Sequence, residues 1–412
     1  IRESLVAIID AAIDAARADG SLELAEAPQA ALERPRDEAN GNWASTVAMR
    51  TAKLAHKNPR EIAQIIVDHI PANDMIASVE IAGPGFINDA VLQGVVREVR
   101  EEGDNFGRGT IPEGERYVNL EYVSANPTGP FHVGHGRWAS LGDAMARVMR
   151  HGGYDVYEEY YINDHGNQMD VFGNSVNVRY QQLLGRDVEM PEACYGGAYV
   201  KDIAQDIIDQ DGDKWLNVSD EERVEAFREM AYDMTLKNQR EVLANFGTTF
   251  DKWFSERSLY VEDENGESAV SRSLDAMREK GYLYEKDGAL WFRSTDLGDD
   301  KDRVLIKGDG EATYFMSDVA YHYDKMMRGF DHLIDLWGAD HHGYIKRCEC
   351  MLEAWGWPGA LEVQLGQLVN LFRDGKAVRM SKRTGEMVTF EELIDEVGVD
   401  ATRYFLLREI PF

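Results

Sequence analysis

The sequence has little cysteine, and its three cysteines, Cys194, Cys348 and Cys350, form no CxxC pair. Such a set builds neither a disulfide framework nor a zinc ribbon, so we expect reduced thiols and no protein-bound zinc. Long apolar runs are lacking too. No stretch reaches the roughly 18–20 residues that cross a bilayer, and the opening residues Ile1 to Ser4 do not begin a signal peptide. These absences argue against disulfide-scaffold and membrane classes and indicate a cytoplasmic protein without a membrane partner.

Basic residues are also scarce. The chain has 44 lysine and arginine residues against 74 aspartate and glutamate residues, a formal net charge of −30, and only 14 of the basic residues are lysine. Such a charge repels a polyanion unless basic groups cluster or salt screens the field. Because the acidic residues are spread along the whole chain, we interpret them as a surface adapted to high salt, typical of a halophilic source. The net charge therefore does not exclude a nucleic-acid partner.

The length and the hydrophobic content of the chain indicate several domains. At 412 residues with 44% hydrophobic content, the chain can bury two or three cores, because single cores stop growing near about 250–300 residues. Residues 1–112 have the pattern of a small N-terminal α+β domain, which closes with a charged linker beginning at Gly103. Its expected elements are an Ala-rich helix up to about Ala18, two helices separated by Asn58-Pro59, strands near 76–81 and 85–87, and a helix from about Val91 to Glu102.

From Tyr117 onward the pattern is strand, tight turn and helix, as in a doubly wound α/β fold. We expect a Rossmann-like parallel sheet over 113–385, interrupted by a helical insertion at about 165–300 and followed by a helical junction over 386–412. Its ligands should bind beyond the carboxyl ends of the strands. The expected elements are strands at 117–123, from 155, near 333–337 and over 363–371, and a helix at about 136–150.

A histidine pair opens that helix, at the end of the run from Asn126 to His135 (NPTGPFHVGH). Two histidines three residues apart at a helix start face the same side, beside free backbone N–H groups that suit phosphate. Gly134 leaves room for a nucleotide base against the backbone, and the imidazoles can donate to phosphate oxygens as pyrophosphate leaves. The alternatives are a zinc pair and capping histidines.

A basic run, Arg379 to Gly385 (RMSKRTG), follows about 245 residues downstream. A loop that carries three cations can close over a triphosphate and neutralise it most strongly in the transition state. Alone it could be just a basic turn. Combined with the histidine corner at the same sheet, it resembles the signature pair of class I aminoacyl-tRNA synthetases.

Further runs resemble one family within that class, the arginyl-tRNA synthetases, and the resemblance covers nearly the whole chain. These runs are 121–130 (EYVSANPTGP), 298–303 (GDDKDR), 313–322 (TYFMSDVAYH) and 337–344 (WGADHHGY), with 40–44 (NGNWA), 57–63 (KNPREIA) and 79–88 (VEIAGPGFIN) similar to the family's extra domain, which contacts the tRNA elbow. Arg379 stands where the family usually has lysine. The family continues into a helical anticodon-binding domain, which this chain is expected to lack.

The resemblance implies an arginine–tRNA ligase, which activates L-arginine with ATP to arginyl-adenylate and transfers it to the 3′-end of tRNA-Arg for protein synthesis. ATP with Mg²⁺ would be a substrate, tRNA-Arg the partner, and the protein a monomer without a DNA partner. Catalysis would fall to His132, His135 and Lys382. ATP binding would involve Pro130, His132, Gly134, His135, Gly338, Asp340, Met380, Ser381 and Lys382, and arginine binding Glu121, Ser124, Asn126, His132, Tyr314, Asp318 and Asp340.

The chemistry of two acidic residues agrees independently. A guanidinium fork is best held by carboxylates that accept paired hydrogen bonds, and a buried acid without a cation is costly. Glu121, in an otherwise apolar strand, and Asp318, after an aromatic run, fit this role. Their alternatives are a solvent-facing strand residue and a helix N-cap. Asp340 and His341 could hold the ribose or the substrate, or form a structural pair.

Three other functions compete with this interpretation. They are a class I synthetase for another amino acid, a small nucleotidyltransferase that uses the histidine corner alone, and a catalytically silent paralogue that binds tRNA. A nucleotidyltransferase would not need the basic loop, and intact His132, His135 and Lys382 argue against a silent paralogue. A panel of amino acids would separate the first alternative from an arginine enzyme.

Overall fold

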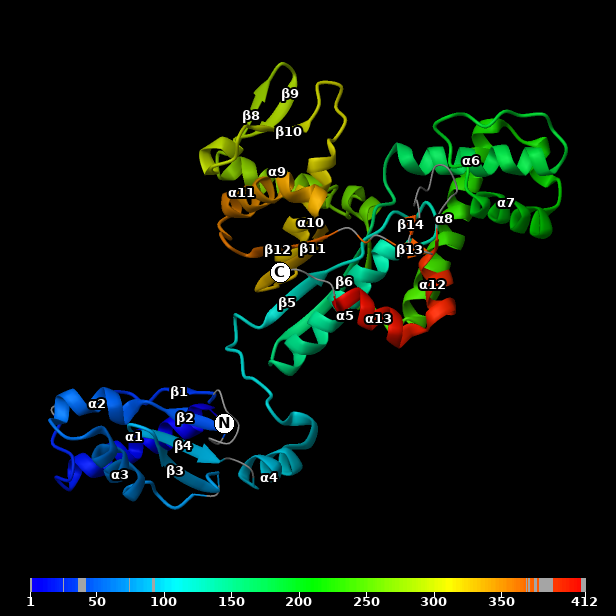
Figure 1. Ribbon diagram of the computed structural model, residues 1–412. Coiled ribbons are helices and arrows are strands. Elements are labelled where there is room, and N and C mark those ends of the chain that lie inside the picture. The colour runs from blue at the N-terminus through cyan, green and yellow to red at the C-terminus, as the bar shows by residue number, and fades with distance from the viewer. Residues whose placement is uncertain are drawn as a thin grey trace. The chain divides into compact units, whose positions relative to one another are not determined.

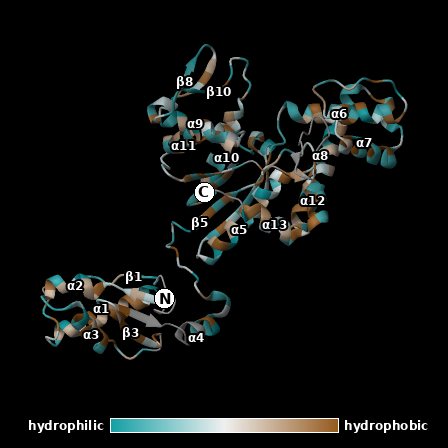
Figure 2. Cartoon of the chain, in the orientation of Figure 1, coloured by the Kyte–Doolittle hydropathy of each residue, from teal (hydrophilic) through white to brown (hydrophobic). Residues whose placement is uncertain are grey.

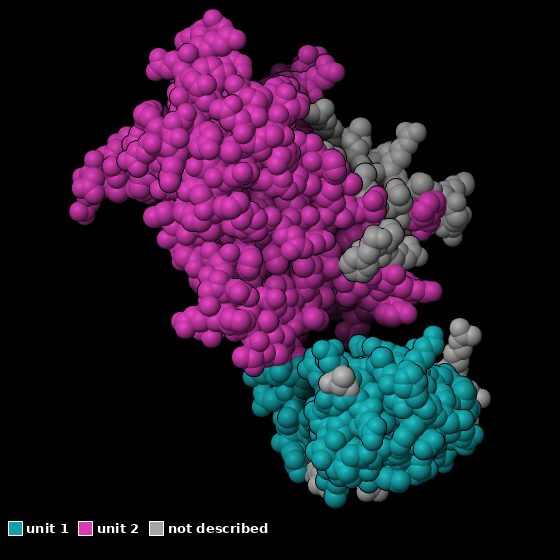
Figure 3. Space-filling model, turned by 90° about the vertical axis from the view of Figure 1, so that its left-hand side faces the viewer, with its two compact units in different colours: residues 1–108 teal, residues 109–412 magenta. Residues whose placement is uncertain are grey.

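The computed structural model describes residues 2–24, 26–35, 42–73, 75–90, 93–367, 369, 371–373, 376–377 and 388–408. The chain divides into two compact units, residues 1–108 and residues 109–412 (Figures 1 and 3). The basic run expected to bind ATP, Arg379 to Gly385, lies outside the described residues, and Met380, Ser381 and Lys382 lie within that run. Within the described part, no helix is long and apolar enough to span a membrane.

The smaller unit packs helices on a four-stranded antiparallel sheet with the order β1-β2-β4-β3. Its core gathers apolar positions of the first helix, among them Leu5, Ile9 and Ile13, against Ile62 and Ile66 of the third. This confirms the expected α+β pattern, in which Pro59 begins a helix that the Asn58 side chain caps. The elements are α1(Arg2–Ala18), β1(Leu32–Glu33), β2(Trp43–Ser45), α2(Val47–Ala55), α3(Pro59–Asp68), β3(Ser78–Ala82), β4(Phe86–Ala90) and α4(Gln93–Glu102).

The larger unit is built on a five-stranded sheet with the order β12-β11-β5-β6-β7, in which every pair of neighbours is parallel. The chain moves outward from β5 through β6 to β7, and then returns to the other side of β5 for β11 and β12. The order therefore reverses between β5 and β11, which is where a doubly wound sheet binds its ligands. The strands are β5(Tyr117–Glu121), β6(Asp155–Ile162), β7(Lys252–Ser255), β11(His332–Gly338) and β12(Leu361–Gly366).

Helices cover both faces of this sheet, and each face has its own core. Neighbouring residues of one strand alternate between the two cores, so Leu333 packs in one and Ile334 in the other. One core holds the helices α9(Ala269–Glu279), α10(Tyr314–Met327) and α11(Ile345–Trp355), and the other holds α5(Val133–His151), α12(Phe390–Val397) and α13(Val399–Arg408). Figure 2 shows hydrophobic stretches along β5 and along the helices beside it, interrupted by hydrophilic residues.

The insertion expected over about 165–300 is not one block, which corrects the sequence-based boundary. Its first part is a helical module with its own core, made of α6(Asn167–Leu183), α7(Ala198–Asp211) and α8(Asp220–Asn245). The chain then returns to the central sheet as β7 before it forms the antiparallel strands β8(Leu283–Lys286), β9(Ala289–Phe292) and β10(Arg303–Ile306). Only four residues form β7, with Trp253 and Phe254 in opposite cores, and so short a strand has no recognisable periodicity.

Candidate active site

A pocket of about 680 Å³ opens at the carboxyl ends of β5 and β11, where the strand order reverses. Its wall draws on the ends of three strands, the turn after β5, and the starts of α5 and α10. Residues expected from the sequence that line it are Glu121, Ser124, Asn126, His132, His135, Tyr314, Asp318, Gly338 and His341.

The histidine pair occupies one side of the pocket and caps α5. The backbone N–H of Gly134 donates to Nδ1 of His132 at 3.0 Å, and the N–H of His132 donates to Nδ1 of His135 at 3.0 Å. Both rings therefore accept through Nδ1, so in the neutral form each carries its proton on Nε2. The two histidines therefore cap the helix, which was one of the alternatives expected from the sequence. The same hydrogen bonds give both imidazoles the tautomer that can donate to an anion.

The glycine between the histidines is required by their own packing. A Cβ on Gly134 would lie 2.8 Å from Cε1 of His132, which is closer than a carbon atom can approach. The corner is held from behind by α12, because the N–H of Phe390 donates to the carbonyl of Phe131 at 2.9 Å and the Phe390 ring fills the space beside Gly136. In this structure the His132 ring lies over Gly134, where we expected room for a nucleotide base. Pro130 and Gly134, which we expected at the ATP site, are not among the residues that line the pocket.

Three carboxylates lie side by side across the sheet at the base of the pocket. Glu121 of β5 pairs in register with Glu159 of β6 and with Asp335 of β11, so all three side chains point to one face of the sheet. Glu159 and Asp335 are fully buried, and Glu121 is 8% exposed. We call this set the acidic row. Three buried carboxylates need cations or hydrogen-bond donors, since an isolated buried charge costs many kcal/mol.

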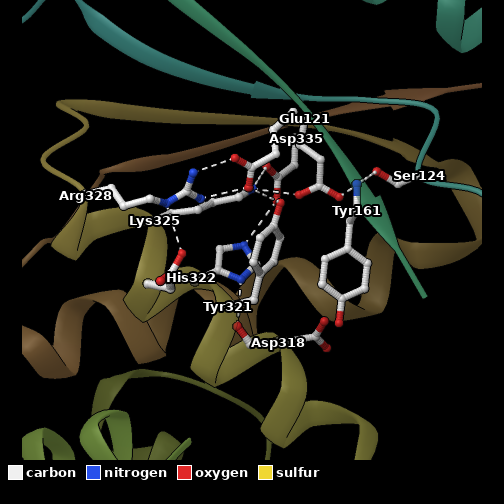
Figure 4. Close-up of polar contacts among 11 residues, drawn as sticks. Glu121, Ser124, Tyr161, Asp318, Tyr321, His322, Lys325, Arg328 and Asp335 are labelled. Carbon is white, nitrogen blue, oxygen red and sulfur yellow. Dashed lines mark hydrogen bonds and ion pairs between the residues drawn. The ribbon is translucent and has the colours of Figure 1, made fainter. Parts of the chain in front are cut away.

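Helix α10 crosses over the acidic row and supplies those partners from positions that share one helix face. Lys325 Nζ donates to Glu121 Oε2 at 2.6 Å and to Asp335 Oδ1 at 2.9 Å. Arg328 donates to both oxygens of Glu159, which also accepts from the Tyr321 hydroxyl (Figure 4). The row is therefore a closed network between the sheet and one helix.

The electrostatics of the row follow from burial and from those cations. Burial raises the pKa of the Glu121 carboxyl, and the Lys325 ammonium opposes that rise. Burial also acts to raise the pKa of Asp335, but Lys325 and His322 outweigh it and lower that pKa to about 2. His322 Nε2 lies 3.1 Å from Asp335 Oδ2. Lys325 has no exposed surface, and its raised pKa keeps it charged.

A second acidic group faces the pocket from the start of α10 and from the segment after β7. Asp318 and Glu256 lie here, and we call them the Asp318 end. Ser317 and Tyr161 hydrogen-bond to Glu256, whose pKa burial raises. Burial raises the pKa of Asp318 to about 7, and the neighbouring carboxylates of Glu256 and Glu121 act in the same direction. Among the described residues, no lysine or arginine forms an ion pair with the Asp318 carboxylate.

Tyr161 contacts both acidic groups. The backbone N–H of Tyr161 donates to Ser124 Oγ at 3.1 Å, and Ser124 Oγ in turn donates to Glu121 Oε1 at 2.9 Å. The Tyr161 side chain hydrogen-bonds to Glu256 of the Asp318 end, and Figure 4 shows it pointing toward the Asp318 carboxylate. Tyr161 thus bridges the acidic row and the Asp318 end.

The turn that carries Ser124 and Asn126 is strained and is clamped from outside. Val123 and Ser124 have φ angles of 70° and 39°, which non-glycine residues rarely adopt. The buried amide of Gln239, on α8, donates to the carbonyl of Asn126 at 3.2 Å and to that of Gly129 at 3.0 Å. The helical module therefore fixes part of the pocket wall.

The sequence did not single out several residues that complete the pocket. Tyr314, which we did expect, stands at the rim with 80% of its surface exposed, and the side chain of Asp340 lies outside the described residues. Two patterns in the sequence could have indicated the missed residues. These are acidic residues within short apolar strands and the spacing of basic residues along α10. The missed residues are Tyr161, Glu256, Tyr321, His322 and Asp335 in the pocket wall and Lys325 beneath it.

A doubly wound parallel sheet with a histidine corner at its reversal point defines the catalytic unit of a class I aminoacyl-tRNA synthetase. Residues 106–408 match the family model described as the class I (R) tRNA synthetase catalytic domain, and residues 3–89 match the arginyl tRNA synthetase N-terminal domain. The chain belongs to the arginyl-tRNA synthetase family.

Relatives of known name agree with these matches. An arginine–tRNA ligase of Geobacter sp. (strain M21) is 48% identical over 413 residues, which span 99% of this chain and 74% of the relative. One from Listeria monocytogenes serotype 4a is 49% identical over 390 residues, which span 93% of this chain and 69% of the relative.

Solved structures agree as well. A structure assigned as an arginyl-tRNA synthetase of Campylobacter jejuni has a TM-score of 0.69 at 37% identity and covers 76% of this chain and 67% of that chain. The arginyl-tRNA synthetase of Thermus thermophilus has a TM-score of 0.61 at 18% identity, covering 99% of this chain and 74% of that chain, and this likeness supports the fold alone.

Proposed function

We propose that the pocket of the larger unit binds L-arginine beside ATP for an arginine–tRNA ligase reaction. The enzyme is an aminoacyl-tRNA synthetase by family. In the first step the arginine carboxylate attacks the α-phosphorus of ATP, which forms arginyl-adenylate and releases pyrophosphate. In the second step a hydroxyl of the tRNA 3′-terminal ribose attacks the activated carbonyl carbon, and AMP leaves.

The observation that carries this proposal is the presence of two separate acidic groups in one pocket, with Tyr161 in contact with both. Arginine has an α-ammonium group and a guanidinium group at the two ends of its carbon chain. Asp318, which lacks a cationic partner among the described residues, can accept from the guanidinium together with Glu256. Glu121, Ser124 and Asn126, beside the histidine corner, are then placed for the α-ammonium end. A neutral or acidic amino acid has no cation other than its α-ammonium group, so it would leave the carboxylates of the Asp318 end uncompensated.

Catalysis in this proposal is positioning and charge stabilisation without a protein nucleophile. His132 and His135 donate from Nε2 to phosphate oxygens, since Nδ1 of each ring is already used as an acceptor. Lys382 and the Mg²⁺ ion, which arrives with ATP as part of the substrate, would neutralise negative charge on the leaving pyrophosphate. Gly338, the last residue of β11, Asp340, which follows it, Met380 and Ser381 complete the proposed ATP site, and Pro130 and Gly134 are proposed to shape its corner.

The partner is proposed to be tRNA-Arg. The family match of residues 3–89 supports a role for the smaller unit in contacting the tRNA elbow. The net charge of −30 opposes binding of a polyanion, so this interaction is expected to need salt that screens the acidic surface. We further propose that the enzyme works as a monomer in the cytoplasm.

Amino-acid-dependent ATP–pyrophosphate exchange tests the function directly. We expect exchange at high potassium with arginine and tRNA-Arg, and no exchange with the other amino acids. Asp318→Asn should raise the KM for arginine by about 100-fold, because a guanidinium hydrogen bond to a charged carboxylate contributes roughly 1.5–3 kcal/mol. Its KM for ATP should stay within about threefold.

Two results would contradict the proposal. Exchange with a different amino acid would refute the arginine assignment and leave the class intact. An Asp318→Asn enzyme with an unchanged KM for arginine would place the guanidinium elsewhere. Glu264→Gln is a matched control, because it removes an exposed carboxylate outside the pocket.

A further inference from the structure

Lys325 is buried beneath the pocket and does not line it. It therefore cannot touch a substrate and can act only through the groups it contacts. Those groups are Glu121 and Asp335, at 2.6 Å and 2.9 Å, and the ring of Tyr321, whose centroid lies 4.4 Å from Nζ. All three line the pocket. A buried cation whose partners all line the substrate site is suited to set the charge of that site.

The charges of the acidic row do not cancel. Arg328 donates two hydrogen bonds to Glu159, which also accepts from Tyr321, and it forms a second ion pair with Asp324. Lys325 is shared between the two remaining carboxylates, Glu121 and Asp335. Asp335 has a second partner in His322, whereas the other partner of Glu121 is the neutral hydroxyl of Ser124. The single charge of Lys325 is therefore shared by two carboxylates, both of which line the pocket.

We propose that Lys325 is a positioning residue, which holds the Glu121 carboxylate as the acceptor for the α-ammonium group of arginine and so directs the guanidinium to the Asp318 end (Figure 4). The inference rests on the proposed function. Arginine has two cationic ends, and only one orientation brings its carboxylate to the histidine corner. A site with two equal acidic ends would also hold arginine reversed, and that complex would be unproductive.

The two ends differ in the carboxylate oxygens that they leave free. Both ends of arginine are cations, so repulsion by the Lys325 ammonium acts on either of them and does not select an orientation. Glu121 already accepts from Ser124 with Oε1 and from Lys325 with Oε2, so it cannot offer both oxygens to the fork of a guanidinium. An ammonium group needs only a single acceptor, whereas at the Asp318 end no lysine or arginine forms an ion pair with Asp318 among the described residues. The lysine thereby makes reversed binding weaker than productive binding.

The simpler alternative is that Lys325 only stabilises the fold. Buried ion pairs contribute little to stability relative to apolar residues of the same size, although removing one partner alone is costly. A purely structural lysine would change the melting temperature without changing which part of the substrate is recognised. The test therefore needs a readout of recognition that is separate from folding.

The experiment compares arginine with 5-guanidinopentanoate, which lacks only the α-ammonium group. The preference is the Ki of this analogue divided by the KM of arginine, both from arginine-dependent ATP–pyrophosphate exchange with tRNA-Arg. The wild-type enzyme should prefer arginine strongly. Lys325→Met and Glu121→Gln should each reduce that preference by about tenfold or more, which corresponds to about 1.4 kcal/mol or more. The double variant Lys325→Met/Glu121→Gln should lose little more of this preference than Glu121→Gln alone, because the lysine acts through that carboxylate.

Two further variants keep the test decisive. If Lys325→Met does not fold, Lys325→Met/Asp335→Asn removes one charge of each sign, keeps the net charge of the row and should show the same loss of preference. Arg328→Met breaks the ion pairs that Arg328, the C-cap residue of α10, forms with Glu159 and Asp324, and neither pair involves Glu121. It should lower the melting temperature and leave the preference unchanged.

The outcomes separate this inference from the proposed function. Full preference in a folded Lys325→Met enzyme, together with a loss in Glu121→Gln, would overturn the positioning role alone. Unchanged preference in both variants would overturn the assignment of Glu121 to the ammonium group and the positioning role with it. Absence of arginine-dependent exchange in the wild-type enzyme would instead refute the proposed function.

Discussion

Asp318 is a pocket residue whose pKa lies near neutral pH. Its carboxyl has a pKa of about 7, because it is buried beside other acids, and a bound guanidinium would favour its ionised form. Arginine binding should therefore expel a proton near neutral pH. The residue would combine a stability cost with the binding function that we propose for it, as active-site residues often do.

We expect arginine to bind about tenfold more weakly at pH 6 than at pH 8, since the fraction of ionised Asp318 falls about tenfold over that range. Calorimetry in buffers of different ionisation enthalpy would measure both the affinity and the released proton. Asp318→Asn should bind weakly at every pH and should release no proton. A wild-type affinity that is flat from pH 6 to 8 would show that Asp318 is not the guanidinium acceptor.

The same pKa predicts an effect on stability. A carboxyl whose pKa is higher in the folded state than in the unfolded state destabilises the fold as pH rises from about 4 to 7, because the unfolded chain releases its proton first. Asp318→Asn should therefore melt at a higher temperature than the wild-type enzyme at pH 8. The difference should shrink at pH 5, and thermal melts at the two pH values would measure it.

At the scale of elements, the helical module of α6, α7 and α8 does more than fill space beside the sheet. Through Gln239 it binds the backbone of the turn that carries Asn126, and through Tyr199 it donates a hydrogen bond to the carbonyl of Thr128 at 3.0 Å. A strained turn persists only when its surroundings determine it. The module is therefore expected to influence arginine binding without touching arginine.

Gln239→Leu tests this coupling. The change removes the donor from the carbonyl of Asn126 and from the buried carbonyl of Gly129, so it should destabilise the larger unit by about 1–3 kcal/mol and raise the KM for arginine several-fold. Gln205→Leu, on exposed α7 surface, is the matched control. Steady-state kinetics and thermal melts would separate the two effects. A Gln239→Leu enzyme that is destabilised but keeps the wild-type KM would refute the coupling.

At the scale of the whole molecule, the net charge of −30 governs behaviour in salt. Self-repulsion opposes compaction, and the Debye length falls from about 10 Å at 0.1 M salt to about 3 Å at 1 M. The melting temperature at pH 7.5 should therefore rise as KCl is raised over this range. The rise should be smaller at pH 5.5, nearer the sequence pI of 4.7. A melting temperature that does not respond to KCl would contradict the high-salt interpretation.

Much of the larger unit follows from local sequence. The strand at Tyr117, the helix after His132 and the strands near Leu333 and Val363 have clear patterns, and the structure has an element at each place. By contrast, β7 consists of four residues, and β1 and β2 of two and three, so they have too few residues for a periodicity. Their membership in a sheet depends on the strands that pair with them.

The sequence by itself determined the class of fold and the family, and it indicated the residues proposed to bind ATP, because these depend on short continuous runs such as NPTGPFHVGH. Only the tertiary structure decided what Glu121 contacts. The sequence allowed it to face a free guanidinium, whereas the fold places Lys325, 204 positions away in the chain, against it. The row of Glu159, Glu121 and Asp335 depends on strand order and register, and the helix above it supplies cations by its 3.6-residue period. Charge compensation in a buried site is a property of three-dimensional neighbours, and for that reason it appears only once the chain is folded.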